Sequence, residues 1–272
     1  MRLAISNIAW PAEEEADVAA ALQAADVTEV EIAPTKTFTD PLATSETERA
    51  EYLGFWADHG IRVSAFQSML FGRLDLEVFG SPQVREQTAR YLEGFIELAG
   101  QLGAERMVFG SPKNRRVPEG MDLQEAHAIA EEFFRGLGRV AVDHGTVFCI
   151  EPNPTAYDCN YVVNAQQGIE LVARVDHPGF GLHLDAAGMT LAGDDVGASV
   201  RAAGGLLRHF HASAPYLGAL EDTEVDHASA ASALAAIGYT GAVSIEMRPG
   251  DAGEGPARAA AAVELARRYY AG

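Results

Sequence analysis

Four residues in the second half of the sequence could together bind a divalent metal ion. They are three carboxylates and one imidazole: Glu151, Asp185, His211 and Glu246. Each ends a short apolar or β-branched run, and consecutive members are about 30 residues apart, the length of one strand-plus-helix repeat. An ionised carboxylate at the end of a buried strand is costly unless a cation or hydrogen bonds compensate for it. A shared metal ion would supply that compensation.

The type of ligand narrows the choice of metal. Three oxygen ligands and one nitrogen, with no thiolate, suit Mn²⁺ or Mg²⁺, and Co²⁺ or Zn²⁺ would also be accepted. We expect one ion per chain, with Mn²⁺ as the first choice. Any one of the four residues could instead be an ordinary solvated or hydrogen-bonded side chain. The metal hypothesis depends on all four occurring at matched positions.

Eight short apolar segments predict the strands that would carry these residues. They cover residues 2–9, 27–32, 62–67, 106–109, 147–151, 181–185, 207–211 and 242–246. The four ligand candidates are the last residues of the fifth to eighth segments. Because the carboxyl ends of parallel strands meet at one end of a barrel, these side chains would converge there.

Eight helical patterns follow the strands in turn. They cover residues 12–25, 46–59, 82–103, 122–144, 164–175, 195–204, 226–237 and 255–270. Regular alternation of strand and helix indicates a parallel sheet, built as a closed barrel or as an open doubly wound sheet. The open sheet usually has a glycine-rich turn after its first strand, whereas this turn reads Asn7-Ile8-Ala9-Trp10-Pro11. We therefore predict a single-domain (β/α)8 TIM barrel over residues 1–272, with its active site at the carboxyl ends of the strands.

Polar residues near the strand ends are candidates for binding a substrate. The set comprises Asn7, Gln67, Lys113, Asn153, His183 and Arg248. Lys113 begins the most basic segment of the chain, in which Arg115 and Arg116 could also hold an anionic or polyhydroxylated ligand, although a plain exposed loop fits equally well. Glu31, Ser111 and Trp10 would complete the wall of the pocket.

Histidines also occur two residues before two of the ligand candidates. Side chains two apart on a strand share a face, so His183 should lie one layer beneath Asp185, and His209 one layer beneath His211. Buried imidazoles at such positions can orient a metal ligand. His209 could equally be a hydrogen-bonded core residue. Cys149, beneath Glu151 in the same way, is most simply a small core residue.

The overall composition excludes several classes of function. A formal net charge of −19, from 39 acidic and 20 basic residues, repels phosphate backbones and argues against nucleic acid as a partner. No apolar run is long enough to span a bilayer, and the first residues lack the pattern of a secretory signal. We expect a cytoplasmic protein with Cys149 and Cys159 both reduced, because their spacing fits neither a zinc knuckle nor a redox pair.

The segments around the ligand candidates resemble a known family. They are Ile150-Glu151-Pro152-Asn153, Gly181-Leu182-His183-Leu184-Asp185, His209-Phe210-His211-Ala212-Ser213 and the stretch from Gly238 to Glu246. They are similar to the sugar phosphate isomerase/epimerase family of xylose-isomerase-like barrels, which includes the ketose 3-epimerases. The resemblance implies that Glu151 and Glu246 bind the metal and also shuttle the proton as catalytic acid and base. One departure is Gly188, because many relatives carry a histidine at that position.

The chemistry of such a site defines the function we expect. A metal ion that chelates a carbonyl and the neighbouring hydroxyl oxygen acidifies the C–H between them and stabilises the metal-bound enediolate. Return of the proton on the opposite face, or to the adjacent carbon, makes the protein an epimerase or isomerase of a keto sugar or related polyol. The alternative is a metal-dependent lyase or dehydratase acting on a keto sugar or cyclic keto polyol, and after it a non-catalytic sugar-binding barrel. The expected partner is a small polyhydroxy carbonyl compound, and a homodimer is compatible with the sequence.

Overall fold

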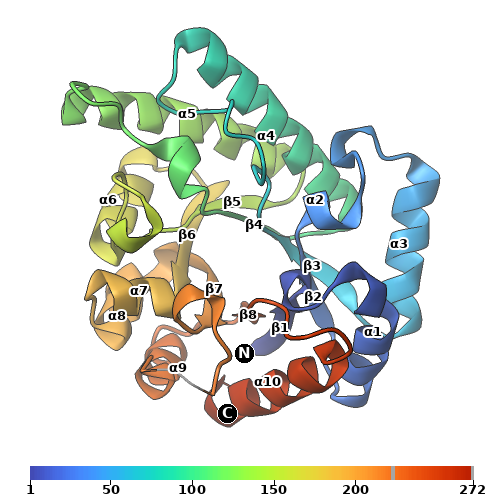
Figure 1. The fold of residues 1–272 in the computed structure, drawn as a ribbon. Coiled ribbons are helices and arrows are strands. Elements are labelled where there is room, and N and C mark those ends of the chain that lie inside the picture. The colour runs from blue at the N-terminus through green and yellow to red at the C-terminus, as the bar shows by residue number, and fades with distance from the viewer. Residues whose placement is uncertain (222–223, 271–272) are drawn as a thin grey trace.

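The chain forms a closed barrel of eight parallel strands surrounded by helices. The computed structural model describes residues 1–221 and 224–270, so residues 222–223 and 271–272 of the predicted domain lie outside it. The strands follow one another around the barrel in chain order, from β1 to β8, and β8 pairs with β1 to close it. In Figure 1 the strands form the central ring and the helices lie outside. The predicted single-domain TIM barrel is confirmed.

All eight predicted strands are present. Their bounds are β1 Arg2–Ser6, β2 Glu29–Ile32, β3 Arg62–Phe66, β4 Arg106–Phe109, β5 Val147–Ile150, β6 Phe180–Asp185, β7 Leu207–Ser213 and β8 Ala242–Glu246. Three boundaries differ from the sequence prediction by more than one residue. β2 begins at Glu29, two residues later than predicted. β1 stops at Ser6 because Asn7–Ala9 turns into a short 3-10 helix capped by the Ser6 side chain. β7 runs beyond His211 to Ser213, which pairs with Glu246 of β8.

The eight predicted helices are also present. Their bounds are α1 Glu15–Ala24, α3 Glu46–Asp58, α4 Pro82–Leu102, α5 Leu123–Asp143, α6 Ala165–Val175, α8 Val196–Ala203, α9 His227–Ala236 and α10 Gly255–Tyr270. Two short helices, α2 Pro34–Thr37 and α7 Ala186–Ala192, were not predicted. Both begin within two residues of the end of a strand, at the end of the barrel where the candidate site lies. They are too short for an apolar period to show in the sequence.

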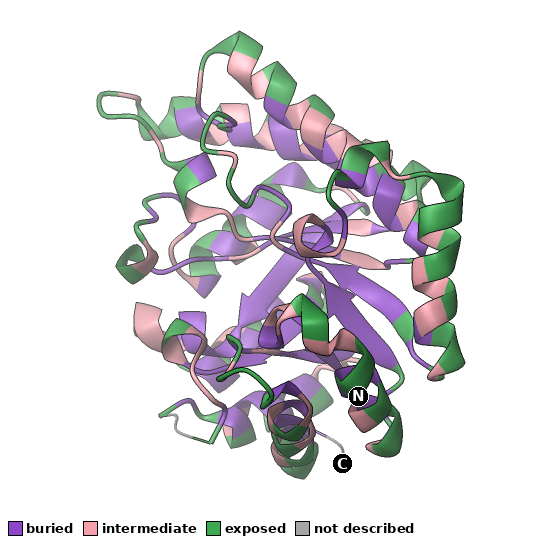
Figure 2. Cartoon of the chain, turned by 45° about the vertical axis from the view of Figure 1, so that its right-hand side comes forward, coloured by how far each residue is buried: buried purple, intermediate pink, exposed green. Residues whose placement is uncertain are grey.

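The helices cover the barrel through one apolar face each. In α5 the buried residues Ala126, Ala130, Phe134, Leu137 and Ala141 recur every three or four positions, which places them on one side of the helix. Figure 2 shows this division, with buried residues on the strands and on the inward helix faces. None of the helices in the described parts of the chain is long and apolar enough to cross a membrane.

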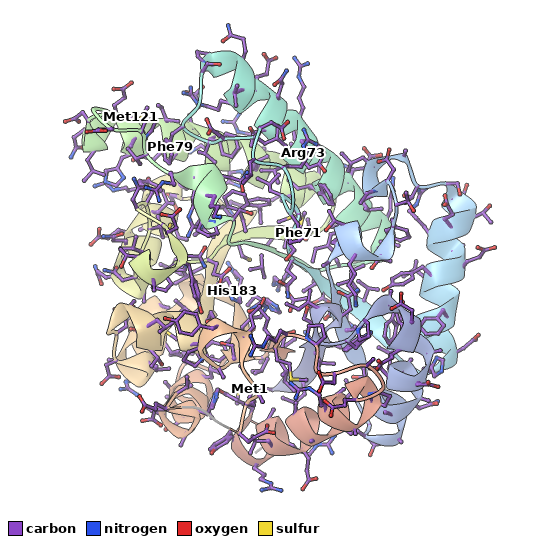
Figure 3. The ribbon with its side chains drawn as sticks, viewed as in Figure 1. Met1, Phe71, Arg73, Phe79, Met121 and His183 are labelled. Carbon is purple, nitrogen blue, oxygen red and sulfur yellow. The ribbon has the colours of Figure 1, made fainter. Side chains whose placement is uncertain are left out.

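The interior of the barrel is polar along three of its strands. Four ionisable residues are buried there: Glu31 on β2, His183 on β6, and His209 and His211 on β7. In Figure 3 His183 lies near the barrel axis, whereas Phe71 lies at the rim. A column of ionisable groups beneath the strand ends is unusual for a packed barrel interior, which is normally filled by branched apolar side chains. This end of the barrel is therefore the candidate functional site.

Candidate metal centre

The four predicted metal ligands converge at the carboxyl ends of β5 to β8. Asp185 and Glu246 are the last residues of their strands, Glu151 directly follows β5, and His211 lies two residues before the end of β7. Nδ1 of His211 is 3.4 Å from a carboxylate oxygen of Glu246 and 3.9 Å from one of Asp185. Ligand atoms of Asp185, His211 and Glu246 lie within 4.8 Å of one another, which is close enough for one ion to contact all three.

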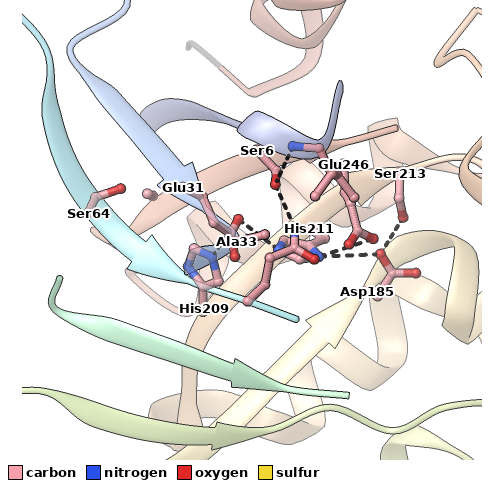
Figure 4. Close-up of polar contacts among 12 residues, drawn as sticks. Ser6, Glu31, Ala33, Ser64, Asp185, His209, His211, Ser213 and Glu246 are labelled. Atoms are coloured by element: carbon pink, nitrogen blue, oxygen red, sulfur yellow. Dashed lines mark hydrogen bonds and ion pairs between the residues drawn. The ribbon is translucent and has the colours of Figure 1, made fainter. Parts of the chain in front are cut away.

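The orientation of the His211 ring is fixed from below by Glu31. Nε2 of His211 donates to Oε2 of Glu31 at 2.9 Å, and Nε2 of His209 lies 3.4 Å from the same oxygen. Burial alone would raise the pKa of Glu31, but His211 and His209 lower it well below its usual value, so Glu31 is ionised. Figure 4 shows this arrangement. Glu31 thus keeps a proton on Nε2, and Nδ1 faces Asp185 and Glu246, where its lone pair would bind a metal that displaces the Nδ1 proton.

Asp185 is held by two hydrogen bonds from its own surroundings. Its Oδ1 accepts from the backbone N–H of Gly188 at 2.5 Å, which caps the first turn of α7. Its Oδ2 accepts from the hydroxyl of Ser213 at 2.5 Å. A Cβ at residue 188 would lie only 3.1 Å from Oδ1, so glycine lets α7 begin directly against the carboxylate. The departure from the family at Gly188 therefore leaves Asp185 in place and well oriented.

The carboxylates of the site repel one another in the protein without a metal. Burial, Glu246 and Asp185 together raise the pKa of Glu151 to about 8. Burial and Glu246 raise the pKa of Asp185 to about 6. Burial would lower the pKa of His211, but Glu31 and Glu246 raise it well above its usual value. A divalent cation would remove these conflicts by neutralising the charge that the groups share.

The residues present fit such an ion. Nδ1 of His211 is fully buried and has no hydrogen-bond partner among residues 1–221 and 224–270. It faces two carboxylates whose oxygens are hard ligands, and no cysteine of the described residues belongs to this group of ligand atoms. Glu151, Asp185, His211 and Glu246 would therefore hold the metal, with three oxygens and one nitrogen.

The raised pKa values predict a pH dependence of stability in the metal-free protein. The folded state binds a proton on Glu151 more tightly than the unfolded chain does, so the resulting stabilisation is complete below about pH 4.5 and is lost as the pH rises through about 8. His211, whose pKa is also raised, acts in the same direction. We expect the free energy of unfolding of the metal-free protein, measured by urea denaturation in EDTA, to fall by about 2 kcal/mol between pH 5.5 and pH 8.5.

Saturating Mn²⁺ should reverse this pH dependence of stability, because the ligands of the metal must be deprotonated. Equal metal-free stability at both pH values would contradict the expectation.

Glu151 depends on a close approach to Gly110, the residue after β4. A Cβ at Gly110 would collide with Oε2 of Glu151. Gly110→Ala should therefore displace this carboxylate and lower kcat about tenfold, the effect of moving a catalytic group by part of an ångström. Steady-state kinetics would measure the change. Gly136→Ala in α5 is the matched control, because its new Cβ would meet nothing within 4 Å, and it should leave kcat unchanged.

Three of the predicted substrate-binding residues line a cleft beside the four predicted metal ligands. It has a volume of about 330 Å³, and Gln67, Lys113 and Asn153 line it together with Glu151 and Glu246. Gln67 follows β3 and donates to the hydroxyl of Ser6. Asn153 accepts from Arg115 through Oδ1, so its amide NH₂ is the group that can donate to a ligand. These three residues lie where the sequence analysis expects a substrate.

The other three substrate-binding candidates do not line this cleft. Asn7 is buried, accepts from the N–H of Ala33 at 2.8 Å and donates to Thr37 at 3.2 Å, which ties the end of β1 to α2. His183 is fully buried, and its ring centroid lies 4.2 Å from that of His211. Arg248 has an exposed side chain on the segment after β8. Their roles toward a substrate stay predictions.

Two expectations were wrong: that Arg115 and Arg116 face a ligand, and that Glu31 forms part of the pocket wall. Arg115 is fully buried and donates to the backbone carbonyls of Gly110 and Tyr161, so it braces the loop after β4 instead of meeting a ligand. Arg116 forms an ion pair with Asp158 on the surface. Glu31 lies beneath the site, where it orients His211, and does not form part of the wall.

Sequence reasoning missed two contributors. Ser213 binds Asp185, and its position two residues after His211 on the same strand face was the available signal. Tyr157, on the short helix Thr155–Tyr157, borders the cleft, and nothing in its local sequence distinguishes it.

A family model described as xylose isomerase-like TIM barrel matches residues 19–269, and the chain belongs to this family. Among curated relatives, D-psicose 3-epimerase of Ruminiclostridium cellulolyticum is 34% identical over 121 residues, which cover 42% of this chain and only 39% of the relative. Among solved structures, D-psicose 3-epimerase in the presence of D-fructose aligns with a TM-score of 0.84 over 100% of both chains, at 19% identity. The IolI protein with a bound zinc atom aligns with a TM-score of 0.77 over 100% of both chains, also at 19% identity. These two structures share the fold of this protein.

Proposed function

We propose that the protein is a divalent-metal-dependent isomerase or epimerase of a keto sugar or related polyol. The observation that carries the proposal is that Glu151 and Glu246 are both potential metal ligands and both line the cleft. The partial sequence match to D-psicose 3-epimerase supports the same class of substrate. Mn²⁺ is the proposed metal, and the IolI protein, which shares this fold, is described with a bound zinc atom.

The proposed mechanism divides the work among the residues of the site. A metal bound by the four ligands would polarise the substrate carbonyl and stabilise the negative charge that develops on deprotonation. Glu246 removes the proton from the carbon beside the carbonyl, and Glu151 returns a proton, or the two exchange these roles. Gln67, Lys113 and Asn153 bind hydroxyl groups of the substrate. Glu31 and Ser213 hold His211 and Asp185 in position, as described above.

A lyase or dehydratase on the same scaffold is the alternative, because the same deprotonation can be followed by expulsion of a β-substituent. Its support is the shared need for a carboxylate base beside a metal, which the site supplies equally well. A location in the cytoplasm and assembly into a homodimer remain predictions from the sequence.

The experiment that tests the proposal combines metal analysis with proton exchange. Metal content would be measured on the purified protein, and a panel of ketoses and keto acids would then be followed by NMR in D₂O with Mn²⁺ added. We expect one metal ion per chain and deuterium incorporation next to a carbonyl. The product separates an epimerase from an isomerase or a lyase. Failure to bind metal under all loading conditions would overturn the proposal and favour a sugar-binding barrel.

A further inference from the structure

The imidazole of His183 is buried beside the metal centre without a partner of its own. It lies fully buried on β6, and neither of its ring nitrogens has a hydrogen-bond partner among the residues that the structure describes. A buried polar group without a partner costs free energy, and such groups are rare in folded proteins. The ring does not line the cleft, so a substrate bound there would not supply the partner.

The side chain of His183 reaches toward the carboxyl ends of the strands. In the pairing of β6 with β7, His183 lies opposite His209. Asp185 and His211 form the next layer toward the carboxyl ends. The ring centroid of His183 is nevertheless 4.2 Å from that of His211, but 5.3 Å from that of His209. The ring therefore lies closer to the predicted metal ligand than to the residue that pairs with it across the strands.

A ring nitrogen of His183 also lies close to two of the carboxylates. Ligand atoms of Glu151, His183 and Asp185 are all within 4.8 Å of one another. Ligand atoms of Asp185, His211 and Glu246 form a second group with the same spacing. The two groups share Asp185, so His183 is as close to the centre of the site as the predicted ligands are.

We propose that His183 is a fifth protein ligand of the metal, in addition to the four predicted from the sequence. The proposal rests on the metal-dependent function proposed above and adds a residue to its metal centre. One nitrogen of the buried ring gains the partner that it lacks. A second imidazole shifts the preference of the site away from Mg²⁺ and toward transition ions such as Co²⁺ and Zn²⁺, because Mg²⁺ is bound mainly by oxygen ligands.

A neutral fifth ligand suits a centre whose carboxylates also exchange protons. In the proposed mechanism Glu151 and Glu246 bind the metal and carry a proton in turn. A protonated carboxyl group is a poor metal ligand, because metal binding requires the deprotonated form. His183 takes no part in the proton transfer, so it would hold the ion while either glutamate carries the proton.

The test counts the histidines that bind Co²⁺. The metal-free protein would be loaded with Co²⁺, and its proton NMR spectrum would be recorded in H₂O and in D₂O. A histidine that binds Co²⁺ through one nitrogen gives a strongly shifted, exchangeable N–H signal from the other nitrogen. We expect two such signals with one Co²⁺ bound per chain, from His183 and His211, and a single signal in His183→Leu.

Metal affinities provide a second readout that does not depend on activity. His183→Leu should weaken Co²⁺ binding at least about tenfold, measured against a competing chelator, and Mg²⁺ binding less than about threefold. His227→Leu is the matched control, because it makes the same change at another buried imidazole, which bonds to Tyr270 on the far side of β7 and β8 from the barrel interior. The control should leave both affinities and both NMR signals unchanged.

The outcomes separate this proposal from the proposed function. A single shifted signal from the unaltered protein with one Co²⁺ bound would overturn the assignment of His183 and leave the centre with four ligands intact. Two Co²⁺ ions per chain would also overturn it, by placing His183 in a separate site with His209. Failure to bind any metal would overturn the proposed function as well. The count on the unaltered protein decides the assignment even if His183→Leu does not fold.

Discussion

Replacing Glu246 with glutamine is expected to lower kcat for proton exchange by about 10³-fold, while part of the metal affinity remains. The amide keeps an oxygen that can contact the metal, but it cannot accept a proton from carbon, and general base catalysis contributes about 10²–10⁴ in rate. Deuterium incorporation by NMR would measure the loss of activity, and calorimetric titration with Mn²⁺ would measure the retained binding.

A conservative control is available on the surface. Glu51→Gln makes the same chemical change on an exposed face of α3 and should leave kcat and metal affinity unaltered. If Glu246→Gln kept near-normal exchange with metal bound, the mechanism with two glutamates would be wrong, and another group would have to supply the base.

Replacing Glu31 with glutamine is expected to weaken Mn²⁺ binding by about 10- to 100-fold, although Glu31 is not one of the four ligands. Partners that orient a metal-bound imidazole have effects of this size when they are removed. The neutral amide accepts less strongly from Nε2 of His211, so the tautomer that presents Nδ1 to the metal is less favoured. Metal titration with a competing chelator would measure the change.

Strand β2 itself provides the control for this change. Glu29 precedes Glu31 by two residues, but its carboxylate pairs with Arg2 and Arg62 at the opposite end of the barrel. Glu29→Gln should reduce stability without altering metal affinity. A Glu31→Gln protein that binds Mn²⁺ as tightly as the unchanged protein would show that the His211 ring is held by packing alone.

The barrel and the four proposed metal ligands could both be predicted from the sequence. Strand and helix patterns are local, because the burial of one face repeats every two residues in a strand and about every 3.6 in a helix. The position where a strand ends can also be read from the local sequence. In a parallel barrel the carboxyl ends of all strands lie at the same end of the barrel. The convergence of Glu151, Asp185, His211 and Glu246 could therefore be predicted without coordinates. The same is true of the positions of Gln67, Lys113 and Asn153 beside them.

The side chains that hold those residues in position could be found only from the tertiary structure. Glu31 and His211 are 180 positions apart in the chain and meet only because the barrel closes. No periodicity distinguishes Arg115, which is buried as a brace, from Lys113, which borders the cleft two residues earlier. The pattern of a segment records whether it is buried, but its partners are set by how distant segments pack, and that packing depends on the whole fold.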